Sequence, residues 1–118
     1  NKDEDSYNGF GEVYFSTVKH NAIKSWRRHK RMTLNLIVPI GTIRFILYDD
    51  RNLSKTNGSF NEIIISKDNY QRITIPPMIW FAFQGIGEKS NFLLNISNLK
   101  HDDSEEDRKN LNEISFKW

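Results

Sequence analysis

The sequence contains no cysteine, only three prolines and six glycines, and no long apolar run. The absence of cysteine excludes disulfide scaffolds, thiol nucleophiles and cysteine-bound zinc from these 118 residues. No apolar stretch approaches the ~20 residues that a membrane-spanning helix needs. We therefore expect no membrane partner, and the reducing cytoplasm is the expected location.

Phosphate-loop and metal motifs are also missing. No G-x-x-x-x-G-K-[ST] loop occurs, and Gly9-Phe10-Gly11 lacks the third glycine of a dinucleotide-binding fingerprint. The three histidines, His20, His29 and His101, are not paired at ligand spacing, whereas a metal site needs at least three convergent ligands. We expect no metal and no other cofactor.

Composition predicts one folded domain over residues 1–118, because 37% of residues are hydrophobic, 27% are charged and a single core serves a chain of this length. The net charge is only +2, but it is unevenly distributed. Residues 19–31 hold six Lys or Arg and no acid, and residues 102–107 hold five acids and no base. This pattern favours a local anion site over a nucleic-acid partner, and a solvated basic loop is the alternative.

Aromatic and β-branched residues gather in short runs separated by turn clusters, which is typical of an all-β sandwich or barrel. We predict seven strands, at 12–18, 33–38, 42–48, 60–66, 71–75, 79–84 and 91–97. The second and third flank Pro39-Ile40-Gly41, which predicts a hairpin. One short C-terminal helix is predicted over 103–110, where Asp102, Asp103 or Ser104 can cap the start and acids crowd the first turn. Residues 1–9 are polar, and we expect them to form no strand.

The candidate site begins with the basic segment 24–31. In an extended segment alternate residues share a face, so Arg27 and His29 point the same way. Two such groups facing a barrel interior need an anionic or hydrogen-bonding partner. The alternative is that both lie on a rim loop in water.

Four further polar residues interrupt apolar strand patterns and are candidates for lining a pocket. Glu12 and Tyr14 share one face of the first predicted strand, and Asn35 and Asn95 each lie between two apolar residues. An asparagine at such a position either lines a pocket, satisfies a buried network or faces solvent.

The order of segments resembles a known family. Glu12-Val13-Tyr14-Phe15-Ser16 is followed by Ile23 to His29, then Tyr48-Asp49-Asp50-Arg51, then Ile75-Pro76-Pro77 with Trp80 to Gln84, and finally Ile114 to Trp118. From about residue 10 onward this order resembles the dTDP-4-dehydrorhamnose 3,5-epimerase family, the RmlC-like cupins. The resemblance implies a jelly-roll barrel, a homodimer, and about one more strand before the start of this chain.

The family's chemistry implies a nucleotide-diphosphate sugar as partner, epimerised beside its 4-keto group during surface polysaccharide synthesis, without a metal. The resemblance places Arg27 where the family has its base histidine, and Phe81 where it has a second histidine. The tyrosine acid falls near Leu94, and the aspartate that orients the base falls near residues 110–112. Lys24 matches the family's cationic position.

Two main hypotheses remain open. In the first, the chain is a divergent epimerase or isomerase in which His29 and Tyr14 are catalytic, and Lys24, Arg27, Asn35, Glu12 and Asn95 bind substrate. In the second, it is a non-catalytic cupin that binds a nucleotide sugar or serves in assembly. Fold alone does not decide between them.

Overall fold

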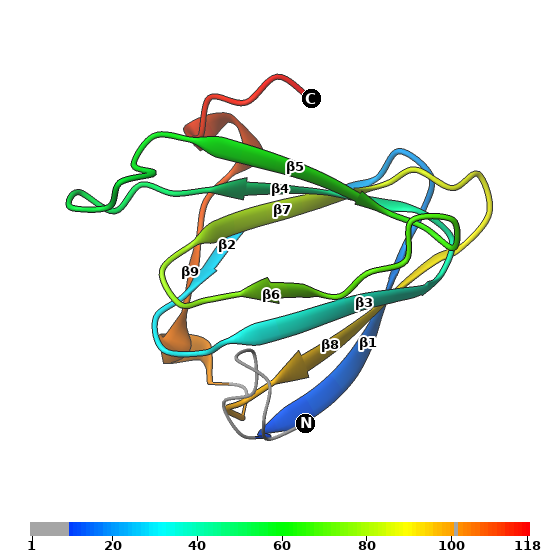
Figure 1. The fold of residues 1–118 in the computed structure, drawn as a ribbon, viewed down its shortest axis with the longest axis horizontal. Helices are drawn as coiled ribbons and strands as arrows, with labels where there is room; N and C mark the ends of the chain where they lie inside the picture. Colours follow the sequence, from blue (N-terminus) through cyan, green and yellow to red (C-terminus); the bar gives the residue numbers. More distant parts are fainter. Residues whose placement is uncertain (1–9, 101) are drawn as a thin grey trace.

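The computed structural model describes residues 10–100 and 102–118, and within them it has nine strands in two sheets (Figure 1). Residues 1–9, for which we predicted no strand, lie outside the described residues. The strands are β1 Glu12–Val18, β2 Ile23–His29, β3 Leu34–Ile40, β4 Ile43–Tyr48, β5 Phe60–Ile65, β6 Ile73–Ile75, β7 Trp80–Gly85, β8 Asn91–Ser97 and β9 Glu106–Arg108.

One sheet has four strands in the order β1-β8-β3-β6, and the other has five in the order β5-β4-β7-β2-β9. All the strand pairs within these sheets are antiparallel. The two sheets face one another, which confirms the predicted all-β jelly-roll barrel (Figure 1). The seven predicted strands are all present to within two residues, and β2 and β9 are additional.

The predicted hairpin is wrong, because β3 and β4 belong to different sheets. Gly41 has φ 86° at the turn, so the glycine does reverse the chain as expected. The side chain of Asn91 accepts a hydrogen bond from the Thr42 backbone N–H at 2.8 Å and donates to Val18 and Gly87. This buried amide joins the turns at that end of the barrel, so the chain crosses between sheets there.

The predicted helix over 103–110 is mostly wrong. A single 3-10 turn spans Asp103–Glu105, with Asp102 capping it as expected through its bond from the Ser104 N–H. The next residues form β9, because pairing with the edge of β2 supplies backbone partners that a helix would otherwise provide. A second 3-10 turn spans Leu111–Glu113.

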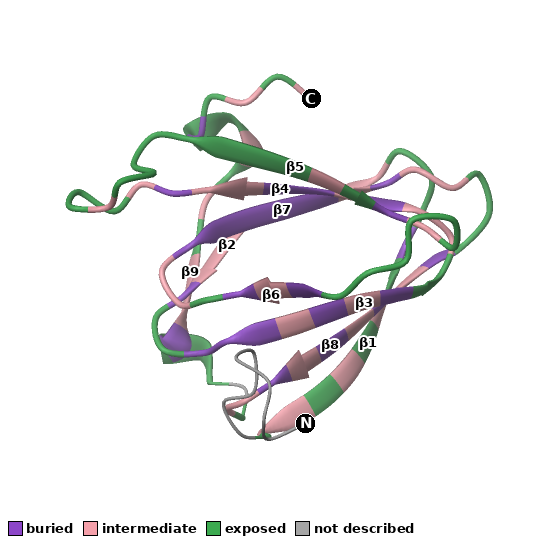
Figure 2. Ribbon diagram, in the orientation of Figure 1, coloured by how far each residue is buried: buried purple, intermediate pink, exposed green. Residues whose placement is uncertain are grey.

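Two apolar clusters hold the sheets. The main core lies between the sheets and is built from alternate residues of facing strands (Figure 2). A second cluster lies on the outer face of the five-stranded sheet, where Ile114, Phe116 and Trp118 pack near Trp26 and Trp80. The C-terminal segment therefore covers that sheet from outside. The structure contains no helix long and apolar enough to cross a membrane in its described residues.

Candidate functional site

A bulge in β2 determines which side chains face the barrel interior. The pairing with β7 shifts between Lys24 and Arg27, so that both residues register with inward-facing phenylalanines. Trp26 instead packs into the outer cluster. Without the bulge, two residues three positions apart would point to opposite faces. Arg27 and His29 therefore share the inner face, as the sequence predicted.

A cavity of about 280 Å³ lies where β1, at the edge of the four-stranded sheet, meets β9, at the edge of the five-stranded sheet. It is lined by Glu12, Tyr14, Arg27, Glu106 and Arg108. Three different strands supply these residues, so the site depends on the closure of the whole barrel. We take this cavity as the candidate active site.

Tyr14 lies on the β1 side of the cavity. Burial and then the negative charge of Glu106 raise its pKa, while the nearby charge of Arg27 opposes the rise. Its hydroxyl accepts a hydrogen bond of 3.1 Å from the buried side chain of Asn95, which lies opposite it in the β1–β8 register. The phenol is therefore held in place and keeps its proton at neutral pH.

A histidine and a glutamate meet on the opposite side. Glu106 lies directly across from His29 in the β2–β9 register, and its carboxylate is 3.8 Å from His29 Nε2. Their side chains are only 7% and 5% exposed. The His29 ring stacks on Phe81 at a centroid distance of 6.1 Å. The other carboxylate oxygen of Glu106 binds the Arg108 guanidinium.

The structure brings together most, but not all, of the predicted site residues. Glu12, Tyr14 and Arg27 line the cavity, and Asn95 supports Tyr14. His29 lies behind the lining, next to Glu106.

The other two predicted residues lie elsewhere. Lys24 is an exposed residue of β2 and does not line the cavity. Asn35 lies on the outer face of its sheet, where it accepts a hydrogen bond from Thr74, because its neighbours Leu34 and Leu36 face the core. Of the alternatives considered from the sequence, Asn35 therefore faces outward and does not line the pocket.

Sequence reasoning missed Glu106 and Arg108. The acidic run 102–107 favoured the start of a helix, and a helix would not place Glu106 and Arg108 on the same face. As a strand, the segment Glu106-Asp107-Arg108 places Glu106 and Arg108 on one face and Asp107 on the other, where it binds Arg28 at 2.9 Å. The sequence signal that could have located the pair is the position of Glu106 and Arg108 two residues apart, which in a strand places them on one face.

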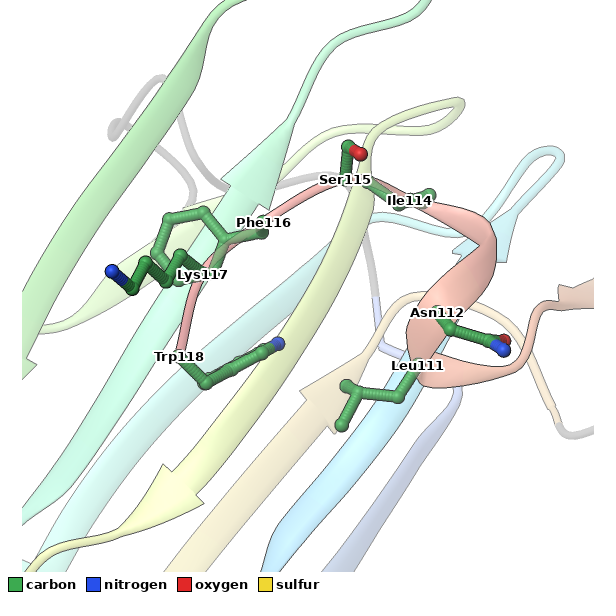
Figure 3. A pocket seen from close by; sticks show the side chains of 7 residues that line it. All are labelled: Leu111, Asn112, Ile114, Ser115, Phe116, Lys117 and Trp118. Atoms are coloured by element: carbon green, nitrogen blue, oxygen red, sulfur yellow. The ribbon is translucent and has the colours of Figure 1, made fainter.

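A larger cavity, of about 540 Å³, lies at the C-terminal segment, between the turn at Leu111 and the indole of Trp118 (Figure 3). Its lining comes from residues 111–118 alone and holds one charged side chain, Lys117. It therefore lacks the converging acids and bases of the cavity at β1 and β9.

In the described part of the chain, no three His, Asp or Glu side chains gather as a metal ion would require. His101 lies outside the described residues. The expectation that no metal is bound remains a prediction.

Comparison with known proteins agrees with this architecture. No family model matches the chain. The Haloferax volcanii protein named "Probable low-salt glycan biosynthesis epimerase Agl13" is 33% identical over 98 residues, which is 80% of this chain and 63% of that protein. The chain therefore spans less than two thirds of that curated relative.

Solved structures give the same result. A dTDP sugar isomerase from Desulfovibrio desulfuricans G20 superposes with a TM-score of 0.90 at 34% identity, over 95% of this chain and 72% of that one. The dTDP-4-dehydrorhamnose 3,5-epimerase of Bacillus anthracis, solved with TDP and PPi bound, has a TM-score of 0.77 at 18% identity, over 88% and 67%. The chain belongs to the dTDP-4-dehydrorhamnose 3,5-epimerase family of RmlC-like cupins, as a divergent member.

Proposed function

We propose that this chain is an epimerase or isomerase of a nucleotide-linked 4-keto sugar and moves a proton on a carbon beside the keto group. The observation that carries the proposal is the meeting of proton-exchanging groups from both sheets in one cavity. Tyr14 stands on one side, the His29–Glu106 pair on the other, and Arg27 also lines the space. The names of the two relatives, an epimerase and an isomerase, support it.

The cavity's residues suit each step of that reaction. A base on the β9 side removes the carbon-bound proton, and the electron pair moves to the carbonyl oxygen to give an enolate. The Arg27 guanidinium would stabilise the developing negative charge. Tyr14 would then return a proton from the opposite side, which inverts the carbon. Its raised pKa keeps the phenol protonated for this role.

Substrate binding would use the remaining predicted residues. Arg27 suits a diphosphate because its guanidinium forms two parallel hydrogen bonds to phosphate oxygens, and exposed Lys24 can add a second cation from the same strand. Glu12, which lines the cavity, suits the hydroxyl groups of a sugar. Asn95 acts by holding Tyr14. Asn35 is not included, because it lies on the outer face.

A second candidate function is binding of a nucleotide sugar without turnover. One observation favours it: Arg27 occupies the position where the family resemblance places the base, and a guanidinium with a pKa above ~12 does not act as a base. The presence of a buried acid–base pair, His29 and Glu106, favours catalysis instead.

Deuterium exchange separates the two functions. The protein is incubated with a panel of 4-keto nucleotide sugars in D₂O, and label at the carbons beside the keto group is measured by NMR. We expect label with at least one sugar and a lower rate of labelling with the His29→Ala variant, whose fold is checked by circular dichroism. Binding in calorimetry without any label would establish the non-catalytic function.

We also propose that two copies pair through the outer face of the four-stranded sheet. Val13 and Phe15 of β1 are exposed there, Phe15 at 70%, next to Leu94 and Ile96 of β8. Such an apolar face is typical of a homodimer interface. Light scattering should give twice the monomer mass, and Phe15→Ser should shift the protein toward the monomer. A monomer at micromolar concentration would contradict this.

The name of one relative also suggests a biological role for this chain. The Haloferax volcanii relative is named for glycan biosynthesis, and we propose surface polysaccharide synthesis for this chain. The cytoplasmic location stays a prediction from the sequence.

A further inference from the structure

Glu106 lies on β9, a strand of three residues at the edge of the five-stranded sheet. The β2–β9 register sets it opposite His29 and sets Arg108 opposite Arg27. Asp107, between them, points to the outer face and binds Arg28 through two hydrogen bonds of 2.9 and 3.1 Å. The edge strand therefore delivers one carboxylate to the cavity and one to the outside of the sheet.

The two members of the His29–Glu106 pair are not equivalent. Glu106 lines the cavity together with Tyr14, whereas His29 is not part of the lining. His29 is flanked by Phe81 on one side and by the Glu106 carboxylate on another. A substrate in the cavity would thus meet the carboxylate first, with the imidazole behind it.

The contacts of Glu106 suit an ionised carboxylate. Its two oxygens contact two different basic side chains, Arg108 and His29, and no backbone N–H group is among these contacts. Arg108, whose side chain is 66% exposed, has room to shift as a substrate enters, whereas the buried His29 is held against Phe81. Tyr14 faces the same carboxylate from the other sheet, and its pKa is raised first by burial and then by that negative charge.

We infer that Glu106 is the catalytic residue that takes the proton from the carbon beside the keto group, with His29 as its positioning residue. This inference rests on the proposed function. The proton passes from carbon to a Glu106 oxygen while the electron pair moves to the carbonyl oxygen. Tyr14 returns a proton from the opposite sheet, and the carboxylic acid of Glu106 then restores the phenol through solvent. Carboxylates perform this proton abstraction beside carbonyl groups in other enzymes.

The test compares four variants in the deuterium-exchange assay, with substrate affinity measured by calorimetry. Glu106→Gln should lower the exchange rate by about 100-fold or more, the usual contribution of a general base, and leave Kd within about threefold. Glu106→Asp should restore part of the rate. His29→Gln should lower the rate by about tenfold and leave Kd within about threefold, because the carboxylate loses the side chain that positions it while the binding groups stay in place. Asp107→Asn, which removes the same charge from the outer face, should stay within about twofold.

Three other outcomes count against the inference. If Glu106→Gln keeps its rate within about threefold while His29→Gln abolishes exchange, His29 contacts the substrate and the inference is overturned, with the proposed function intact. Loss of affinity and rate together in Glu106→Gln would make Glu106 a binding residue. If the wild-type protein binds a nucleotide sugar but exchanges no proton, the proposed function fails and the assignment fails with it.

Discussion

Glu105 and Glu106 are consecutive residues with almost buried side chains, but their carboxylates have different kinds of hydrogen-bonding partner. The Glu105 carboxylate accepts hydrogen bonds from the backbone N–H groups of Arg31 and Met32 and from the Arg31 side chain. Glu106 contacts only the side chains of His29 and Arg108 in the interactions that the structure records for it.

The difference lies in what each carboxylate satisfies. Backbone N–H groups at the β2–β3 corner need an acceptor when buried, so Glu105 is fixed by the fold itself. Glu106 binds the exposed side chain of Arg108, which can move, and it borders a cavity. A carboxylate that is fully hydrogen-bonded to buried backbone groups stabilises the fold. A carboxylate with an exposed partner next to a cavity is available for chemistry.

The largest expected effect tests this difference with the same substitution at both positions. Glu105→Gln should lower the free energy of unfolding by roughly 2–3 kcal/mol. Both backbone N–H groups bond to one carboxylate oxygen, so an amide that keeps its oxygen there loses the negative charge and turns its NH₂ group toward the Arg31 guanidinium. Glu106→Gln should lower it by less than about 1 kcal/mol, since an amide can still bond to the Arg108 guanidinium.

Urea unfolding followed by fluorescence measures both values. Equal losses at the two positions would show that Glu106 is as structural as its neighbour.

Acid sensitivity sharpens the same comparison. Burial alone would raise the pKa of Glu105, but the backbone and side-chain bonds from Arg31 and Met32 together hold it below its usual value. A carboxyl with a lowered pKa in the folded state contributes stability that is complete above its unfolded pKa, about 4.3. That stability is lost as the pH falls through the folded value.

We therefore expect the stability difference between the wild type and Glu105→Gln to be constant from pH 7 to pH 5 and to shrink below pH 4. Because Asp49, bound by Arg51, also has a lowered pKa, the wild type and the Glu105 variant will both lose stability in acid. The quantity to measure is therefore the difference between the two urea-unfolding curves at each pH. A difference that grows in acid would contradict the assignment.

The next effect concerns binding rather than stability. Arg27→Ala should weaken nucleotide-sugar binding by roughly 1.5–3 kcal/mol, the range for a hydrogen bond to a charged group. Calorimetry measures it, and Arg28→Ala is the matched control, because Arg28 lies over Trp80 on the outer face of the same strand. Equal losses for the two variants would show that Arg27 acts through general charge.

Sequence patterns predicted seven of the nine strands in the described residues, because these seven have local signals: apolar alternation and turn residues between the runs. They did not predict β9, because three polar residues have no strand signal until β2 supplies a pairing edge. They placed Arg27 and His29 on one face correctly, but the bulge that adds Lys24 to that side depends on pairing with β7. At the crossing between β3 and β4, the Thr42 backbone N–H bonds to Asn91, about fifty residues away, and such a long-range contact has no local sequence signal.

The smallest expected effect concerns the two asparagines, which have the same sequence signature and opposite surroundings. Asn35 bonds to Thr74 on the outer face, and Asn95 bonds to Tyr14 inside the barrel. Asn35→Ala should therefore leave both affinity for a nucleotide sugar and exchange rate within about twofold. Asn95→Ala should lower the exchange rate by about fivefold, since loss of one neutral hydrogen bond of about 1 kcal/mol releases the phenol.

If Asn35→Ala lowers the exchange rate as much as Asn95→Ala does, then the outer face also contributes to the site, most directly through the partner copy in the proposed dimer. Light scattering on the same variant would show whether pairing was lost.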